Sequence, residues 1–162
     1  MKGRLTDKMM CVFLCAALGL ASGFGLPLKA AVVEISEDMT EEGDWLVMLD
    51  SGVTNVVTVA QTGAGKIIKQ GAGTLVLAAQ NSFTGGITLE AGYVSAEASG
   101  CLGSGEITIL GQREDYTGPC ELWLTGSNMD LGAPAIHVTG DTSCQYPAVC
   151  LYGTNNTFSV YV

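Results

Sequence analysis

The sequence predicts an all-β protein, and three observations support this prediction. Between residues 51 and 162, apolar residues recur at a spacing of two, which is the period of a strand with one buried face. Glycine interrupts the same region nearly every ten residues. No stretch there has the periodicity of an amphipathic helix. Hydrophobic residues make up 48% of the 162 residues, which is enough for the core of one domain of modest size.

The predicted strands are short apolar runs flanked by glycine, proline, serine or asparagine. In the run Thr-Leu-Val-Leu at residues 74–77, Leu75 and Leu77 share one face because successive strand residues point to opposite sides. We expect further strands at residues 56–59, 66–68, 87–89, 93–94, 107–110, 122–124, 136–138 and 149–152. The expected core residues are Leu75, Leu77, Ile87, Leu89, Ile107, Ile109, Leu122 and Leu124. Regular strand spacing is also typical of a β-sandwich or a barrel.

Turn residues separate these strands. Gly85 and Gly86 adjoin the strand at 87–89, where a tight reversal needs the positive φ that glycine reaches without steric cost. Gly92 interrupts the chain before the next strand. Asn81 lies in a turn, where its side chain can bond the local backbone or stack on an equivalent residue of a neighbouring turn.

The order of these residues resembles the passenger-associated strand repeat of autotransporters. That repeat runs as a lysine, a glycine pair, Thr-Leu-x-Leu, an asparagine, an aromatic residue with Thr-Gly-Gly, an apolar strand and a further glycine. The matching residues are Lys69, Gly71, Gly73, Thr74, Leu75, Leu77, Asn81, Phe83, Thr84, Gly85, Gly86, Ile87 and Gly92. A weaker match continues through Leu102, Gly103, Ser104, Gly105 and Ile107. The resemblance implies a right-handed parallel β-solenoid, with the β-sandwich as the alternative, and a bacterial envelope or cell-surface setting.

Three segments are expected along the chain. Residues 1–30 have a basic start, an uncharged apolar run at 9–20 and small residues after it, which is the pattern of a secretory signal peptide. The alternative is a membrane anchor, but the run is shorter than the roughly twenty apolar residues that span a bilayer. Residues 31–50 are expected to form an acidic leader or N-terminal cap, and residues 51–162 a solenoid region truncated at its C-terminus. Passengers normally continue into a membrane β-barrel, for which the residues after the repeat leave no room.

Charge disfavours several partners. The formal net charge is −9, and removal of residues 1–30 takes away basic residues 2, 4, 8 and 29 but only one acidic residue, Asp7. Nucleic acid and anionic membrane surfaces both attract basic patches, so neither is an expected partner. The acidic run between Glu34 and Asp50 is typical of a solvated face, and it lacks the loop spacing of calcium sites. We expect no metal and no cofactor.

Four cysteines remain after residue 30, and an even number in an exported chain indicates disulfides. We expect Cys144 to pair with Cys150 across a short loop, and Cys101 to pair with Cys120. The alternative is buried free thiols. Zinc ligation is disfavoured, because there is no Cys-x-x-Cys and the only histidine is His137.

Catalytic candidates are few. His137 lies in an apolar strand with no evident serine or cysteine partner, so a solvent-facing strand histidine is expected. Glu114 and Asp115 are the only adjacent acidic pair in the repeat region, and a loop pair of this kind is usually solvated. Aromatic residues that stack on sugars are the alternative basis for a function, and the candidates are Tyr93, Tyr116, Trp123, Tyr146 and Tyr152.

The expected function is therefore a non-catalytic, exported or cell-surface scaffold or adhesin-like passenger segment. The alternatives are a carbohydrate-binding module and a polysaccharide-acting solenoid enzyme. The apolar, charge-free end at residues 157–162 predicts self-association through an unpaired strand edge. No ligand or host target can be named from the sequence.

Overall fold

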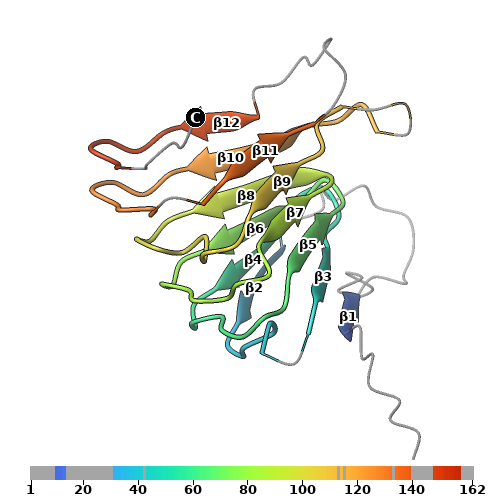
Figure 1. Cartoon of the computed structure of the whole chain (residues 1–162). Coiled ribbons are helices and arrows are strands. Elements are labelled where there is room, and N and C mark those ends of the chain that lie inside the picture. The colour runs from blue at the N-terminus through green and yellow to red at the C-terminus, as the bar shows by residue number, and fades with distance from the viewer. Residues whose placement is uncertain are drawn as a thin grey trace, which may run out of the picture.

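The chain forms a stack of coils built from two parallel β-sheets (Figure 1). The computed structural model describes residues 10–13, 31–41, 43–112, 114, 116–132, 134–139 and 148–157. Sheet A contains β1 (Met10–Phe13), β3 (Trp45–Met48), β5 (Ile67–Gln70), β7 (Ile87–Leu89), β9 (Ile107–Ile109) and β11 (Ile136–Val138), hydrogen-bonded in this order. Sheet B contains β2 (Ala31–Ile35), β4 (Val53–Val57), β6 (Thr74–Leu77), β8 (Gly92–Ala96), β10 (Cys120–Leu124) and β12 (Val149–Leu151), also in this order.

The chain alternates between the two sheets, and every pair of neighbouring strands is parallel. Each coil therefore gives one strand to sheet A and one to sheet B, and the next coil stacks on it. This arrangement is a β-solenoid, which confirms the predicted fold. It excludes the β-sandwich, because sandwich sheets are built from antiparallel strands.

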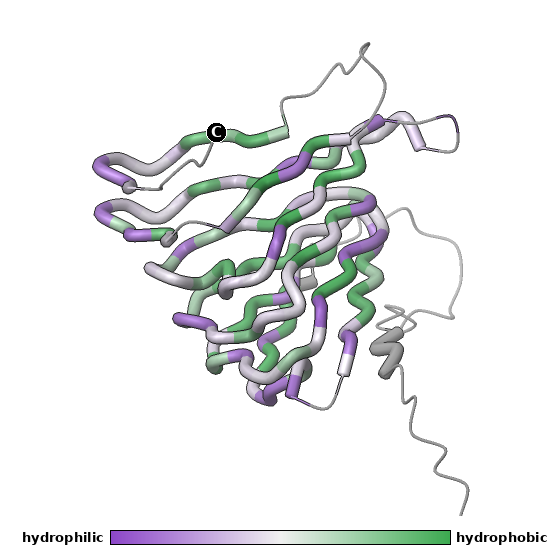
Figure 2. The backbone as a smooth tube through the Cα atoms, viewed as in Figure 1, coloured by the Kyte–Doolittle hydropathy of each residue, from purple (hydrophilic) through white to green (hydrophobic). Residues whose placement is uncertain are grey.

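The core lies between the two sheets and continues from coil to coil. All eight core residues predicted from the sequence are buried, with exposed fractions of 3% or less. Trp45 and Phe83 add two fully buried aromatic side chains to this core. Figure 2 shows the resulting alternation, in which hydrophobic residues recur along the strands between polar ones. Spacing of two was thus a reliable guide to which side chains face inward.

The first coil was not foreseen. β2 and β3 lie inside residues 31–50, the segment expected to be an acidic leader or cap, and they are hydrogen-bonded parallel to β4 and β5. Trp45 and Val47 of β3 are buried, so this part of the segment belongs to the solenoid. Its acidic residues Glu34, Glu37, Glu41 and Asp44 do not prevent this, because their side chains lie outside the core.

Several strand boundaries differ from the predicted ones. β4 covers 53–57 instead of 56–59, because the polar residues Thr54 and Asn55 hid its beginning in the sequence. Asn55 is an inward-facing residue of that strand and is 2% exposed. β11 covers residues 136–138, as predicted.

Glycines stand where successive coils come too close for a side chain. Gly71 and Gly92 occupy equivalent corners between sheet A and sheet B, with φ of 72° and 78°. A Cβ on Gly92 would overlap the carbonyl oxygen of Gly71, and a Cβ on Gly71 would overlap that of Leu49. Glycine is therefore required by both the backbone conformation and the spacing between coils.

Of the predicted signal peptide, the structure describes residues 10–13, and the rest lies outside the described residues. In the described part of the chain, no helix has the length and apolar character needed to cross a membrane.

Candidate functional site

The lysine of the repeat is buried inside the solenoid. Lys69 lies on β5 with its side chain inward, and its exposed fraction is 0%. Its Nζ donates hydrogen bonds to the carbonyl oxygens of Gln70 at 2.8 Å, Gly71 at 2.6 Å and Ala91 at 3.0 Å. An ammonium group has three N–H donors, so these three carbonyls use all of them. Lys69 thereby joins the corner after β5 to the equivalent corner after β7.

Burial lowers the pKa of Lys69 to about 7, because the charged form loses its hydration. The neighbouring Cys120 opposes this shift, since a negative charge there favours the ammonium. The Cys120 thiol donates to the carbonyl oxygen of Glu90 at 3.0 Å. Because Lys69 is sealed in the core, this group can hold the coils together but cannot reach a ligand outside them.

Asn81 connects its coil to the coils on both sides. Its Oδ1 accepts a hydrogen bond from the backbone N–H of Gln61 at 2.8 Å, and its Nδ2 donates to the carbonyl oxygen of Cys101 at 2.5 Å. One coil earlier, the side chain of Gln61 also bonds the backbone of the preceding coil: its Oε1 accepts a hydrogen bond from the N–H of Met39 at 2.7 Å. The predicted alternatives for Asn81 were local bonding or stacking, and the structure shows hydrogen bonding between coils through backbone groups.

The other motif residues have structural positions. Phe83 is fully buried, whereas Thr84 is exposed. A Cβ on Gly85 would overlap the carbonyl oxygen of Gly65 in the preceding coil. Gly86 has a φ of 82°, as expected for the reversal before β7. Taken together, the repeat residues specify how one coil docks on the next.

A second set of equivalent corners lies near the C-terminal end of the described chain. Residues 126–129 (Gly-Ser-Asn-Met) and 153–156 (Gly-Thr-Asn-Asn) lie against each other. The Nδ2 of Asn155 donates to the Oδ1 of Asn128 at 3.3 Å, and both residues have a positive φ of 56° to 57°. Asn156 accepts from the N–H of Met129 at 3.1 Å, just as Asn81 accepts from Gln61. The sequence signal was the repeated Gly-[Ser/Thr]-Asn.

Three of the five candidate aromatic residues gather on the outer face of sheet B. The rings of Tyr93 on β8 and Trp123 on β10 have centroids 4.3 Å apart with a 38° interplanar angle. Tyr152, just after β12, packs edge-on against Trp123 at 5.8 Å and 85°. The indole N–H of Trp123 donates to Glu121 at 2.7 Å. The three rings therefore form a stack across three neighbouring strands, with Tyr152 at its exposed end.

The remaining two aromatic candidates are Tyr116 and Tyr146. The hydroxyl of Tyr116 donates to the carbonyl oxygen of Pro119 at 3.1 Å within its own loop. Tyr146 lies outside the described residues.

The expected disulfide between Cys101 and Cys120 is not present, which corrects that prediction. Cys120 begins β10 beside Gly92 at the start of β8, whereas Cys101 comes after the end of β8. The length of β8 therefore separates them, at about 3.3 Å per residue, and this exceeds the roughly 7 Å between Cα atoms that a disulfide tolerates. Cys101 is a buried thiol in the corner that Asn81 contacts, and burial raises its pKa.

The expected partner of Cys150 lies outside the described residues. Cys144 is not described, so their pairing stays a prediction. In the structure Cys150 is on the outer face of sheet B, where its thiol lies 3.4 Å from the carboxylate of Glu121. Burial and this carboxylate both raise the pKa of Cys150, in that order of importance.

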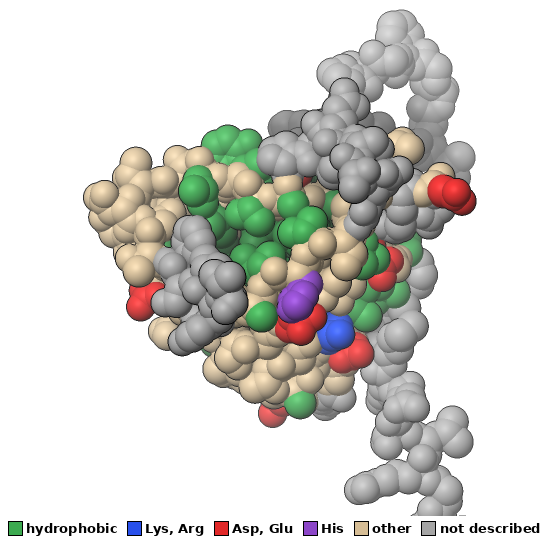
Figure 3. Space-filling model, turned by 45° about the horizontal axis from the view of Figure 1, so that its top comes forward, with side chains coloured by type: hydrophobic (Ala, Val, Ile, Leu, Met, Phe, Trp, Pro, Cys, Tyr) green, Lys and Arg blue, Asp and Glu red, His purple; other side chains and the backbone are tan. Residues whose placement is uncertain are grey.

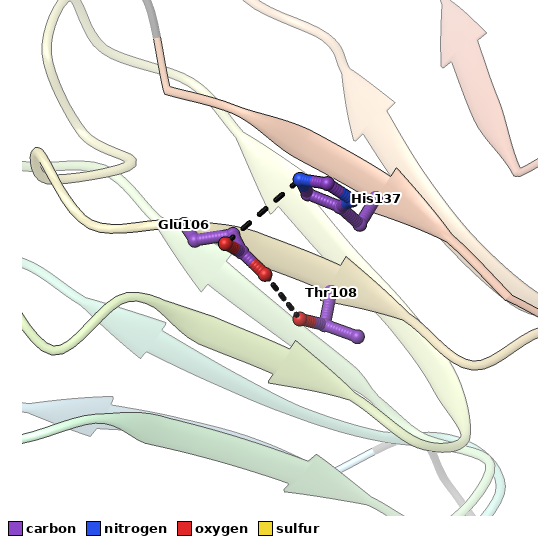
Figure 4. A network of polar contacts seen from close by, with 3 residues as sticks. All are labelled: Glu106, Thr108 and His137. Carbon is purple, nitrogen blue, oxygen red and sulfur yellow. Dashed lines mark hydrogen bonds and ion pairs between the residues drawn. The ribbon is translucent and has the colours of Figure 1, made fainter.

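The only histidine faces solvent on sheet A. Figure 4 shows His137 of β11 beside Glu106, at 3.8 Å between Nε2 and Oε2, with Thr108 donating to the other carboxylate oxygen at 3.4 Å. The hydroxyl of Thr108 thus bonds the carboxylate and not the imidazole. A hydrolytic triad requires the reverse, with the hydroxyl on the imidazole.

The acidic candidates give no constellation in the described residues. Glu114 is exposed, and Asp115 is outside the described part. A search of the described residues finds no group of three or more histidine, cysteine, aspartate or glutamate side chains placed to hold a metal ion.

Comparison with known proteins agrees with the geometry of the coils. The model of the passenger-associated-transport-repeat family matches residues 67–96, which run from the start of β5 to the end of β8. No curated protein and no solved structure matches the chain. The matched segment contains Lys69, Asn81 and the corner glycines, the residues that dock one coil on the next. Residues 67–96 are therefore similar to the passenger-associated transport repeat.

Proposed function

We propose that this chain is an exported, non-catalytic β-solenoid segment of the passenger type, which acts as a scaffold or adhesive surface. The observation that supports this proposal is that the repeat residues lie inside the solenoid, whereas other side chains are left exposed on its outer faces. Hydrophobic side chains fill the space between the sheets along the described coils, and the repeat residues Lys69 and Asn81 are buried and spent on contacts between coils. Groups able to meet another molecule lie on the outer faces.

The outer face of sheet A favours contact over catalysis. His137 and Glu106 are 60% and 59% exposed, so water surrounds both side chains. Catalysis by such groups relies on a water-excluded site, where hydrogen bonds and charges have larger effects. Exposed charges in a salt solution are screened, so their contribution to a transition state is small.

An activity assay tests the non-catalytic part of the proposal. The full chain is incubated with polysaccharide, ester and peptide substrates, and we expect no turnover above a heat-denatured control. His137→Ala should leave the stability of the protein unchanged, because the His137 side chain makes one exposed contact, with Glu106. Hydrolysis abolished by His137→Ala, Glu114→Gln or Asp115→Asn would support the enzyme alternative.

A localisation assay tests the export part. The full chain is produced in a bacterial host with a C-terminal reporter, and the cytoplasmic and envelope fractions are compared. We expect the reporter in the envelope fraction or the medium, and mass spectrometry should show loss of the residues up to the end of the predicted signal peptide. The matched control lacks residues 1–30 and should stay in the cytoplasm. Equal distribution of both forms would contradict export.

One observation favours the carbohydrate-binding alternative, namely the stack of Tyr93, Trp123 and Tyr152 on the outer face. Sugars bind through their C–H faces to exposed ring faces, and the outermost ring, Tyr152, is 64% exposed. Tyr93 and Trp123, however, direct their faces largely at each other. Titration with neutral oligosaccharides, followed by Trp fluorescence, should show a saturable change that Tyr152→Ala removes if this alternative holds.

A further inference from the structure

The exposed hydrophobic residues are concentrated at the two ends of the solenoid. In the described part of the chain, six large hydrophobic side chains are exposed: Val32, Met48, Ile136, Val138, Leu151 and Tyr152. Val32 lies on β2, the first strand of sheet B, and Met48 lies on β3, beside the edge strand β1 of sheet A. The other four lie on β11 or at β12, the last strands of the two sheets. The coils between them carry none. Figure 3 shows hydrophobic side chains gathered on the end of the molecule where β11 and β12 lie.

The exposed residues of the last coil occupy core positions. Ile136 and Val138 align with the buried Ile107 and Ile109 of β9, and Leu151 aligns with the buried Leu124 of β10. Their exposed fractions are 38%, 56% and 61%. These side chains face inward by the same alternation as the rest of the core, but no following coil covers them in the described structure.

Two ladders between coils also stop at this end. The aromatic stack ends at Tyr152, and the asparagine contact between coils ends at Asn155. In the described part of sheet B, β12 is paired only with β10, so its outer edge has no strand beside it. At the other end of the same sheet, β2 is paired only with β4, and Val32 is 68% exposed.

We propose that these two ends bind each other in different copies of the chain, with β2 of one copy pairing in parallel with β12 of the next. Coaxial stacking in this sense keeps the strand direction of both sheets, and in sheet A it brings β11 of one copy to the edge strand β1 of the next. The pairing therefore has the same form as the one between successive coils. Alternation restricts the register, since inward residues must meet inward residues. One register that satisfies it places Leu151 beside Val33 and Cys150 beside the exposed Val32.

Charge supports this direction of stacking over its alternatives. Described residues 134–139 and 148–157 contain no aspartate, glutamate, lysine or arginine. The first coil carries Glu34, Glu37 and Glu41, all exposed. Two first coils would repel each other, whereas a first coil meets no like charge on a last coil. Because the two binding faces differ, the contact is heterologous and can add further copies end to end.

The test uses the full chain in sedimentation velocity and light scattering over a range of concentrations. Wild type should form dimers and longer assemblies. Val32→Glu and Leu151→Glu each place a charge in the proposed contact, and each should raise the apparent dissociation constant about 10-fold or more. Both positions are exposed, so folding should be unaffected, which circular dichroism can verify. The matched control is Ser82→Glu, an exposed position on a middle coil, and it should assemble like wild type.

A mixture of the two variants gives the sharpest result. Val32→Glu keeps an intact last coil, and Leu151→Glu keeps an intact first coil, so equal amounts should form a heterodimer that does not grow further. A monomeric wild type, or assembly that persists in both variants, would overturn the proposal. A Val32→Glu variant that still forms a closed dimer would overturn it in favour of contact between two last coils.

Discussion

The Nζ of Lys69 donates a hydrogen bond to the carbonyl oxygen of Ala91, 22 residues further along the chain. Lys69 belongs to β5, and Ala91 lies in the corner between β7 and β8, one coil later. A charged side chain that reads as a surface residue in the sequence therefore serves as an internal link between two coils.

Replacing Lys69 by methionine should destabilise the fold. Methionine fills a similar volume but leaves the carbonyl oxygens of Gln70, Gly71 and Ala91 without this donor. An unsatisfied buried polar group costs about 1 to 3 kcal/mol, so we expect a loss of about 3 kcal/mol in the free energy of unfolding. Urea denaturation measures this loss. Lys66→Met, at a half-exposed position, is the control and should stay within about 0.5 kcal/mol.

Stability should depend on pH through the same residue. Burial lowers the pKa of Lys69 to about 7 in the folded chain, below the ordinary lysine pKa of 10.5. Between these values the unfolded chain binds a proton that the folded chain does not, so stability rises with pH from about 7 upward. The raised pKa values of Cys101 and Cys150 act in the opposite sense near and above pH 9. The denaturation midpoint of the wild type should therefore be higher at pH 8.5 than at pH 7.0.

The control for this pH dependence is again Lys69→Met. Its midpoint should be nearly constant between the same two pH values. A wild-type midpoint as constant as that of the variant would show that Lys69 remains charged when buried, because the folded and unfolded chains would then bind the same number of protons.

Removing the amide of Asn81 should uncouple neighbouring coils. Asn81→Leu leaves the N–H of Gln61 and the carbonyl oxygen of Cys101 without these partners, in a corner where Asn81 is 8% exposed. We expect a loss of about 2 to 4 kcal/mol for the two groups. Hydrogen exchange should show faster exchange at Gln61. Gln80→Ala, at the exposed preceding position, should leave both measurements unchanged, and equal effects of the two substitutions would contradict the role of the amide.

Substitutions at two glycines can distinguish the cost of backbone strain from the cost of crowding between coils. Gly52 and Gly92 have similar φ values of 79° and 78°, but a Cβ on Gly52 meets nothing within 4 Å. Gly52→Ala should therefore cost about 1 to 2 kcal/mol, from the left-handed backbone alone. Gly92→Ala should cost clearly more, because its Cβ would overlap Gly71 of the preceding coil. Thermal denaturation compares the two, and equal losses would show that the coils can move apart to accept the methyl group.

The sequence predicted the middle of the solenoid better than its ends. Leu75 and Leu77, like Ile87 and Leu89, recur at a spacing of two between glycines, so local pattern alone placed them in the core. Trp45 was missed as a core residue, because the acidic residues around it are typical of a solvated leader. The structure shows that its strand, β3, pairs with β5 in sheet A.

The residues of the candidate site were predicted in part. Lys69 was recognised as a motif residue, and its spacing of two from the buried Ile67 was a signal of its inward direction that its charge obscured. Tyr93, Trp123 and Tyr152 were identified as candidates, but their stacking depends on the register of β8, β10 and β12. They are 30 and 29 residues apart, whereas Ile67, Ile87 and Ile107 of the preceding coils are 20 residues apart, so the spacing of the earlier coils does not reveal that register.

The links between coils are short in sequence. Those made by the side chains of Lys69, Asn81 and Asn156 reach partners between 20 and 30 residues away. A coil can therefore complete its contacts as soon as the next few dozen residues are present, without waiting for a distant part of the chain. Proteins built from such nearest-neighbour contacts fold by propagation from one unit to the next, and short separations favour fast folding. A chain that emerges from a ribosome or a pore one end first can thus lock each coil in turn, and every locked coil becomes the template for the one that follows.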